Sequence, residues 1–201
     1  MPDPTLYTIG HSTRTLKEFV SLLDAFGVKR VVDVRTVPKS RHVPWFNKEK
    51  LSGSLKLRGI LYTHLSKLGG LRHAKKDSRN YGWRNASFRG YADYMATPDF
   101  AQGVSALNKL LAKKCVAIMC AEALPWRCHR SMIADAEVAR GIAVRHIMSA
   151  KTANPHTLTR FAVVDKKCDP PLVQYPPYEE PSSPAALRHA PPLSARAAPR
   201  P

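Results

Sequence analysis

The sequence predicts an α/β fold with three layers, in which helices cover both faces of a mostly parallel central sheet of about five strands. Short apolar runs alternate with segments of helical periodicity as far as residue 150, a pattern typical of this class. The chain of 201 residues is long enough to bury a substantial core. We therefore assign residues 1–150 to one α/β domain and residues 151–201 to a Pro-rich, largely irregular or disordered tail.

The first half of the chain predicts three strands and two helices. A capping box, Thr15 followed by Glu18, opens the first helix, and Gly27 ends it. A weaker helical pattern covers residues 47–57. The apolar runs that indicate buried strands are LYTIG at 6–10, RVVDV at 30–34 and ILYTHL at 60–65.

The second half begins with a segment, residues 68–86, that has no period. Loops of this length within a compact domain are uncommon and are often functional. The tail segment 170–201 holds ten of the 17 prolines and few large apolar side chains, so it cannot repay its ordering entropy by burial. Between them we expect helices at 88–95, at 97–111 and at 127–141, and strands at 115–120 and 142–148.

The composition favours a cytoplasmic, reduced protein with a strongly basic surface. The formal net charge is +17, which makes an anionic small molecule or a nucleic acid a candidate partner. Four irregularly spaced cysteines do not form a secreted disulfide framework, so we expect free thiols. We expect no signal peptide and no membrane partner, because no apolar run approaches the length of a membrane span.

Polar and reactive residues follow three of the predicted strands at their carboxyl ends. In open α/β sheets, ligands bind beyond these ends. The three loops therefore predict one shared pocket. Its candidate residues are His11 and Ser12 after the first strand, Asp33, Arg35 and Ser40 after the second, and Cys120, Glu122, Arg127, Cys128, His129 and Arg130 after the fourth.

The two cysteines of this set predict a nucleophilic or redox site. We expect Cys128 in the first turn of a helix, where the helix dipole and neighbouring arginines lower the pKa of a thiol. Cys120 at a strand end is the alternative nucleophile, with His11 or His129 as its base. A metal site is a competing interpretation, but the spacing Cys-x7-Cys-His lacks the short knuckle of structural zinc sites, and our site assignment contains no metal.

The remaining candidates indicate an anionic substrate. The forked guanidinium groups of Arg35, Arg127 and Arg130 suit phosphate or carboxylate, and we group Ser12 and Ser40 with them as substrate-binding residues. Asp33 and Glu122 are the acids of the edge. Asp33 follows an apolar strand and needs a buried partner, which Arg35 or His11 could provide, so an orienting role and acid–base catalysis are equally open.

Five strings of the sequence, in order, resemble one known family. They are YTIGHSTRTLKEFVSLL, VVDVRTVPKS, LGGLR, FRGYADYM and CAEALPWRCHRSMIA, and the similarity runs from about Tyr7 to Ile147. The family is called domain of unknown function 488. The resemblance implies a cytosolic α/β domain of prokaryotes and supplies no reaction and no cofactor. It marks as motif positions His11, Ser12, Asp33, Arg35, Pro38, Ser40, Gly69, Cys120, Glu122, Cys128, His129 and Arg130.

Three functions remain open at this point. The first is an enzyme with a Cys/His/Asp/Arg pocket that acts on an anionic substrate, a nucleotide or a nucleic acid. The second is a nucleic-acid-binding module in which the Cys/His cluster is structural. The third is a metal-binding or redox-sensing domain. Oligomeric state and cofactor are not indicated by the sequence.

Overall fold

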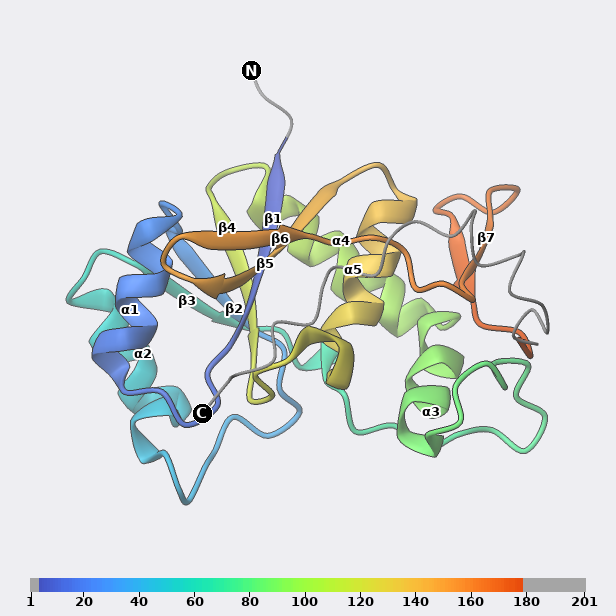
Figure 1. Cartoon of the computed structure of the whole chain (residues 1–201), viewed down its shortest axis with the longest axis horizontal. Coiled ribbons are helices and arrows are strands. Elements are labelled where there is room, and N and C mark those ends of the chain that lie inside the picture. Colours follow the sequence, from blue (N-terminus) through green and yellow to red (C-terminus); the bar gives the residue numbers. More distant parts are fainter. Residues whose placement is uncertain (1–3, 179–201) are drawn as a thin grey trace, which may run out of the picture.

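The computed structural model describes residues 4–178, which form a six-stranded sheet flanked by helices (Figure 1). The strands lie in the order β3-β2-β4-β1-β5-β6, and the first five are mutually parallel. The predicted α/β fold is therefore confirmed, with one additional antiparallel edge strand. The strands are β1 (Thr5–Gly10), β2 (Arg30–Asp33), β3 (Leu61–His64), β4 (Val116–Cys120), β5 (Ala143–Ser149) and β6 (Thr152–Pro155).

Helices cover both faces of this sheet (Figure 1). They are needed on both, because successive apolar side chains of a strand point to opposite faces. The side chains of Val31 and Met119 pack with α1 (Leu16–Ala25) and α2 (Lys48–Lys56) in one core cluster. Val32 and Ile118 belong to a second cluster on the other face. The helices of that second face are α3 (Ala86–Met95), α4 (Pro98–Leu111) and α5 (Arg130–Ala139).

The strand order brings the carboxyl ends of β1, β2 and β4 together at the centre of the sheet. The chain runs from β1 through α1 to β2, and β4 is later inserted between these two strands. Gly10 at the end of β1 pairs with Cys120 at the end of β4, and Asp33 of β2 pairs with Met119. The loops that carry the predicted site residues consequently leave the sheet side by side.

The segment between β4 and α5 differs from the expectation of a helix from residue 127. Pro125 opens a separate 3₁₀ turn, η3 (Pro125–Arg127), and the Cys128 amide closes it by donating to the Pro125 carbonyl over 3.0 Å. Cys128 has an extended backbone and His129 is the N-cap of α5. Cys128 therefore precedes the helix, and its thiol chemistry depends on side-chain neighbours. Two other 3₁₀ turns are η1 (Pro44–Phe46) and η2 (Ser66–Leu68).

Residues 151–178, assigned by sequence to an irregular tail, carry regular structure and part of the core. Besides β6, they form a hairpin of β7 (Val163–Asp165) and β8 (Leu172–Gln174). The side chains of Val173 and Tyr175 are buried in the cluster that contains α3 and α5. A few large side chains, spaced among prolines, are enough to anchor this segment although its composition resembles that of a disordered chain. The remainder of the predicted tail, residues 179–201, lies outside the described residues.

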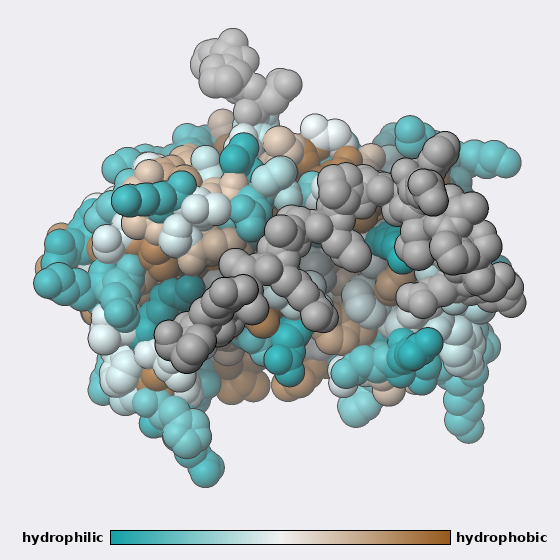
Figure 2. All heavy atoms as spheres, viewed as in Figure 1, coloured by the Kyte–Doolittle hydropathy of each residue, from teal (hydrophilic) through white to brown (hydrophobic). Residues whose placement is uncertain are grey.

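The surface shown in Figure 2 is mostly hydrophilic at both ends of the molecule, with smaller apolar areas between them. Nine large hydrophobic side chains are exposed in the described part of the chain, and Leu57, Leu71 and Trp126 are the most exposed of them. None of the described helices has the length and apolar character that crossing a membrane requires.

Candidate functional site

A pocket of about 590 Å³ opens at the carboxyl edge of the sheet. Three loops build most of it, following β1, β2 and β4, and the remainder comes from the segment around Gly70 and the start of α3. The size suits a ligand of small-molecule dimensions. The lining residues are His11, Ser12, Arg35, Thr36, Val37, Lys39, Ser40, Gly70, Leu71, Ser87, Phe88, Tyr91, Cys120, Ala121, Glu122, Ala123, Arg127, Cys128 and His129.

The floor of the pocket depends on a close approach of two loops. A Cβ atom on Gly10 would collide with the backbone carbonyl of Glu122, so only glycine fits at the end of β1. Beyond it, the amides of His11 and Ser12 donate to the carbonyls of Cys120 and Ala121 over 2.9 and 2.8 Å. Ser12 has a φ of 47°, a left-handed backbone that is uncommon for serine and is often found at functional sites.

Asp33 and Arg35 form a buried ion pair beneath the pocket. Arg35 donates to the Asp33 carboxylate from Nε over 2.9 Å and from Nη2 over 2.6 Å, and the side chain of Asp33 is fully buried. Tyr62 donates a further bond to the same carboxylate over 2.7 Å, and Arg35 Nη2 also donates to the Phe46 carbonyl over 2.7 Å. Asp33 is thus occupied with holding Arg35, which favours the orienting role over acid–base catalysis.

His11 belongs to the same cluster and is held as a neutral ring. Its Nδ1–H donates to the Ser12 carbonyl over 2.9 Å, so Nε2 carries the lone pair and accepts from Arg35 Nη1 over 3.2 Å. Burial, together with the charge of Arg35, lowers the pKa of His11 to about 4. Stacking on Phe46 at a centroid distance of 4.3 Å completes its fixation. With its lone pair engaged by Arg35, His11 has no basic nitrogen available to a nucleophile.

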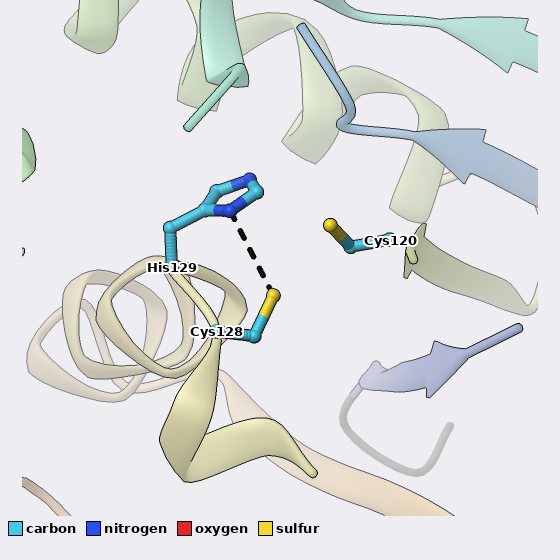
Figure 3. Close-up of side chains that lie close together, drawn as sticks. All are labelled: Cys120, Cys128 and His129. Atoms are coloured by element: carbon cyan, nitrogen blue, oxygen red, sulfur yellow. Dashed lines mark hydrogen bonds between the residues drawn. The ribbon is translucent and has the colours of Figure 1, made fainter. Parts of the chain in front are cut away.

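The second cluster at this edge contains the two cysteines and His129 (Figure 3). Cys120 comes from the end of β4, Cys128 follows the turn η3, and His129 is the N-cap of α5; all three side chains point toward one another. The Sγ atoms and a ring nitrogen lie within 4.8 Å of one another. Cys128 Sγ is 3.7 Å from Nδ1 of His129. The geometry is that of a cysteine–histidine dyad with a second thiol beside it.

The orientation of the His129 ring is fixed from three sides. Its Nε2–H donates to the Val34 carbonyl over 3.0 Å, which leaves Nδ1 to face the sulfur of Cys128. The ring of Tyr91 packs against it with centroids 5.0 Å apart. Gly70 makes room for it, because a Cβ atom there would collide with Nδ1. The bond to Val34 sets the tautomer in which His129 can accept the thiol proton.

Arg130 lies behind Cys128, and 1% of its side chain is exposed. Its Nε donates to Cys128 Sγ over 3.4 Å, while its other nitrogens donate to Thr8 Oγ1 over 3.3 Å and to the Glu122 carbonyl. Across residues 4–178, no carboxylate oxygen lies within 4.0 Å of this guanidinium. The acidic group in direct contact with this buried cation is therefore the thiol of Cys128.

These neighbours move the pKa values of the two thiols in opposite directions. A hydrogen bond from Cys120 lowers the pKa of Cys128 well below its usual value, and His129 and Arg130 act in the same sense against the effect of burial. The pKa of Cys120 is raised, because its thiol is the donor to Cys128 and because it is buried. The two directions make Cys128 the more acidic thiol of the pair and the better candidate for a thiolate.

The same cluster offers three donor atoms to a metal ion, namely two sulfurs and one imidazole nitrogen. A cation bound there would face the guanidinium of Arg130, which already contacts Cys128 Sγ. The positive charge of Arg130 repels a divalent ion at this position. The same charge attracts, and so stabilises, a thiolate when no metal is bound.

Nine of the eleven predicted site residues line the pocket, and Asp33 and Arg130 are buried behind it. Ser40 and Glu122 stabilise their own loops, since Ser40 Oγ accepts from the Val43 amide and the Glu122 carboxylate accepts from the Leu124 amide. Arg127 is exposed at the mouth, as is Lys39. The charge of Arg35 is paired with Asp33, so Lys39 and Arg127 are the lining cations that face solvent.

The sequence did not mark the part of the pocket wall that α3 and the segment around Gly70 supply. Phe88 and Tyr91 lie in the helix expected at 88–95, and Gly70 lies in the segment 68–86 that has no period. Glycines side by side in that loop were the available signal, because both approach other groups closely. Of the tryptophans near the site, Trp83 is partly buried and packs against Phe88 and Phe161, whereas Trp126 is 61% exposed beside Arg127.

The fold and the site together define an α/β protein with a cysteine–histidine cluster at the carboxyl edge of its sheet. Comparison with known families matches residues 15–137 to the family described as Domain of unknown function DUF488. The chain belongs to this family, as the resemblance implied. No curated protein and no solved structure shows a significant match. The matched range includes both cysteines, His129 and Arg130, and it begins after His11 and Ser12.

Proposed function

We propose that the protein is an enzyme that uses Cys128 as its nucleophile on an anionic substrate bound in the carboxyl-edge pocket. The observation that carries this proposal is the buried guanidinium of Arg130, whose Nε contacts Cys128 Sγ at 3.4 Å. A buried cation needs an anion, and a thiolate at Cys128 supplies it. The neighbouring His129 offers a base with the required tautomer.

The chemical step is group transfer through a covalent intermediate. The Cys128 thiol gives its proton to Nδ1 of His129, whose Nε2–H stays bonded to the Val34 carbonyl. The thiolate attacks an electrophilic carbon or phosphorus atom of the substrate, and an Sγ bond to that atom forms. The leaving group departs with the electrons of its bond and takes the proton from His129. Water then attacks the same carbon or phosphorus atom and gives a proton to His129, and the bond to Sγ breaks with its electrons, which restores the Cys128 thiolate.

Thiol alkylation of the full chain tests the nucleophile without a known substrate. Iodoacetamide is added over a range of pH, and the modification of each cysteine is followed by mass spectrometry. We expect Cys128 to react faster at about pH 6 than the exposed Cys168, although Cys128 is buried, because the thiolate is the reactive form. If Cys128 reacts more slowly than Cys168 at every pH up to about 8, the proposed nucleophile is wrong.

Anion selection by the pocket is tested by replacing the neutral reagent with iodoacetate, which has similar size and a negative charge. Lys39 and Arg127 at the mouth should favour it at Cys128 relative to Cys168, and salt should weaken this preference. Arg127→Gln should reduce the preference. Arg58→Gln removes an equal charge just before the amino end of β3, at the opposite edge of the sheet, and should leave the preference unchanged. Equal preferences in all three proteins would contradict an anionic substrate.

Nucleic-acid binding is a second candidate, which the net charge of +17 and the exposed Trp126 beside Arg127 favour. An exposed aromatic ring next to a cation is typical of single-strand binding. Fluorescence anisotropy with a labelled single-stranded oligonucleotide should then show binding that weakens steeply with salt and with Trp126→Ala. Binding that is absent at low salt excludes this function and leaves the enzyme proposal intact.

A further inference from the structure

A chain of buried and part-buried hydrogen bonds runs from Arg130 at the start of α5 to Asp135 of the same helix. Thr8 Oγ1 of β1 lies 2.8 Å from His146 Nδ1 of β5, and His146 Nε2 lies 2.9 Å from His156 Nδ1. His156 Nε2 lies 2.9 Å from Asp135 Oδ1 of α5. The Arg130 guanidinium joins at the first residue, because its Nη1 donates to Thr8 Oγ1 over 3.3 Å. We call Thr8, His146, His156 and Asp135 the relay.

The hydrogen positions of the relay have one consistent direction. Asp135 accepts from Nε2–H of His156, so a neutral His156 has its lone pair on Nδ1 and accepts from Nε2–H of His146. His146 then accepts at Nδ1 from the Thr8 hydroxyl. Burial, with His156 and Arg130 nearby, lowers the pKa of His146 to about 3, which keeps this ring neutral. Every donor points away from Arg130 and toward the carboxylate.

The far end of the relay is firmly anchored. The Asp135 carboxylate accepts bonds from the Thr159 amide and hydroxyl over 2.8 and 2.7 Å, and from the Tyr175 hydroxyl over 2.8 Å. Asp135 and Tyr175 are fully buried. His156 and these anchoring donors lie in residues 151–178, the segment that follows the predicted domain boundary. Such a satisfied buried network is rigid, since each member holds the next in one rotamer.

We propose that the relay holds the Arg130 guanidinium so that its Nε stays within hydrogen-bond distance of Cys128 Sγ. Thr8, His146, His156 and Asp135 are then positioning residues for the nucleophile. The inference rests on the proposed function of Cys128 and extends it to residues outside the pocket. Without the Thr8 contact, the guanidinium would keep two carbonyl partners, from Glu122 and Ala123, and neither fixes Nε on the sulfur. The relay therefore connects the segment after β5 to the reactive thiol.

Thr8→Val tests the relay because it replaces the hydroxyl by a methyl group of the same size in a fully buried position. Thr63→Val is a matched control, since Thr63 Oγ1 of β3 also accepts a bond from an arginine, Arg30 Nη1, over 2.7 Å. Thr8→Ser keeps the hydroxyl. The measurement is the pH profile of Cys128 alkylation by iodoacetamide in the full chain. The other titratable groups near Cys128 are Cys120, Tyr91, His129 and His146, and the three threonine variants retain all of them.

We expect Thr8→Val to shift the midpoint of the profile upward by about one pH unit, which slows alkylation about tenfold below the midpoint. Thr63→Val and Thr8→Ser should keep the profile of the unaltered chain. If Thr8→Val does not fold, His146→Phe removes both relay bonds of that ring and should shift the midpoint in the same direction. A folded Thr8→Val or His146→Phe protein with an unshifted midpoint overturns the relay.

The unaltered chain separates this failure from failure of the proposed function. If its Cys128 reacts like an ordinary buried thiol, the nucleophile itself is wrong. If its Cys128 reacts as a thiolate and the relay variants leave that unchanged, Cys128 remains the nucleophile and only the positioning role is lost. A shift in Thr63→Val equal to that in Thr8→Val would also overturn the relay, because it would show a general effect of removing a threonine hydroxyl that an arginine contacts.

Discussion

Two buried arginines lie at the same edge of the sheet, and their surroundings give them different chemistry. Arg35 has a carboxylate partner, Asp33, at 2.6 Å, and its remaining donors are taken by a carbonyl and a neutral histidine. Arg130 has no such carboxylate among the described residues, and its Nε instead contacts the sulfur of Cys128 at 3.4 Å. Arg35 is satisfied by a carboxylate and therefore has a structural role, whereas the contact of Arg130 with an ionisable thiol is the basis of the proposed activation of Cys128.

The largest expected effect comes from breaking the satisfied pair. Asp33→Asn removes the charge opposite Arg35 and sets an amide N–H against its donors, so the free energy of unfolding should fall by about 3–5 kcal/mol. Urea denaturation measures this loss. Asp99→Asn is the matched control, because Asp99 forms an exposed pair with Lys67, and its loss should cost at most about 1 kcal/mol. Equal costs for the two variants would show that the Arg35 cluster is not held by its ion pair.

The His11 ring gives the Arg35 cluster a pH dependence with a defined sign. Its folded-state pKa of about 4 lies below the ordinary value of 6.5, so the folded protein binds fewer protons than the unfolded chain between these values. Stability should therefore fall by up to about 3 kcal/mol as the pH drops from about 6.5 to 4.

His11→Gln supplies the control for this pH dependence. The glutamine carbonyl can still accept from Arg35 Nη1, but it does not titrate in this range. Urea denaturation of both proteins as a function of pH gives the contribution of His11 as a difference, in which the titration of His146 cancels. Parallel stability curves would contradict a neutral, buried His11.

The Arg130 side of the comparison predicts a change of reactivity rather than of stability. Arg130→Met removes the cation beside Cys128. Because Arg130 forms no ion pair with a carboxylate of the described residues, the free energy of unfolding should fall less than in Asp33→Asn. The midpoint of the Cys128 alkylation profile should rise by about one to two pH units. Arg140→Met makes the same replacement at the end of α5 and should leave the profile unchanged. An unshifted midpoint in Arg130→Met would show that the contact does not stabilise a thiolate.

Much of the fold could be predicted because its signals are local. The capping box of Thr15 and Glu18 is present in the structure, and each predicted strand of the parallel sheet is found within a few residues of its expected bounds. The start of α5 could not be predicted, because the separate turn at Pro125 depends on one backbone bond to Cys128. Anchoring of residues 151–178 depends on Tyr175 reaching a distant carboxylate, for which composition carries no signal.

The site could be predicted as a set of residues but not as two clusters. Parallel strands bring their carboxyl ends together, and this rule was enough to collect His11, Arg35 and Cys128. The spacing and residue type of Arg35 and Arg130 predict the same role for both, the binding of an anion. Their difference comes from one rotamer choice, in which Arg35 turns back to Asp33 two residues away while Arg130 turns toward Cys128. Such pairing follows from packing, which periodicity and spacing do not contain.

The smallest expected effect tests how tightly the thiol site is built. Gly70→Ala places a methyl group against His129 Nδ1, so the ring must tilt away from Cys128 or lose its bond to the Val34 carbonyl. Losing the weak contact between Nδ1 and Sγ, at about 0.5–1 kcal/mol, should slow alkylation of Cys128 about threefold at a pH near 6. Gly53→Ala is the control, because a Cβ atom there meets nothing within 4 Å and the helix α2 accepts alanine readily. An unchanged rate in Gly70→Ala would mean that His129 does not assist Cys128 and that Cys120 and Arg130 suffice to lower the pKa of its thiol.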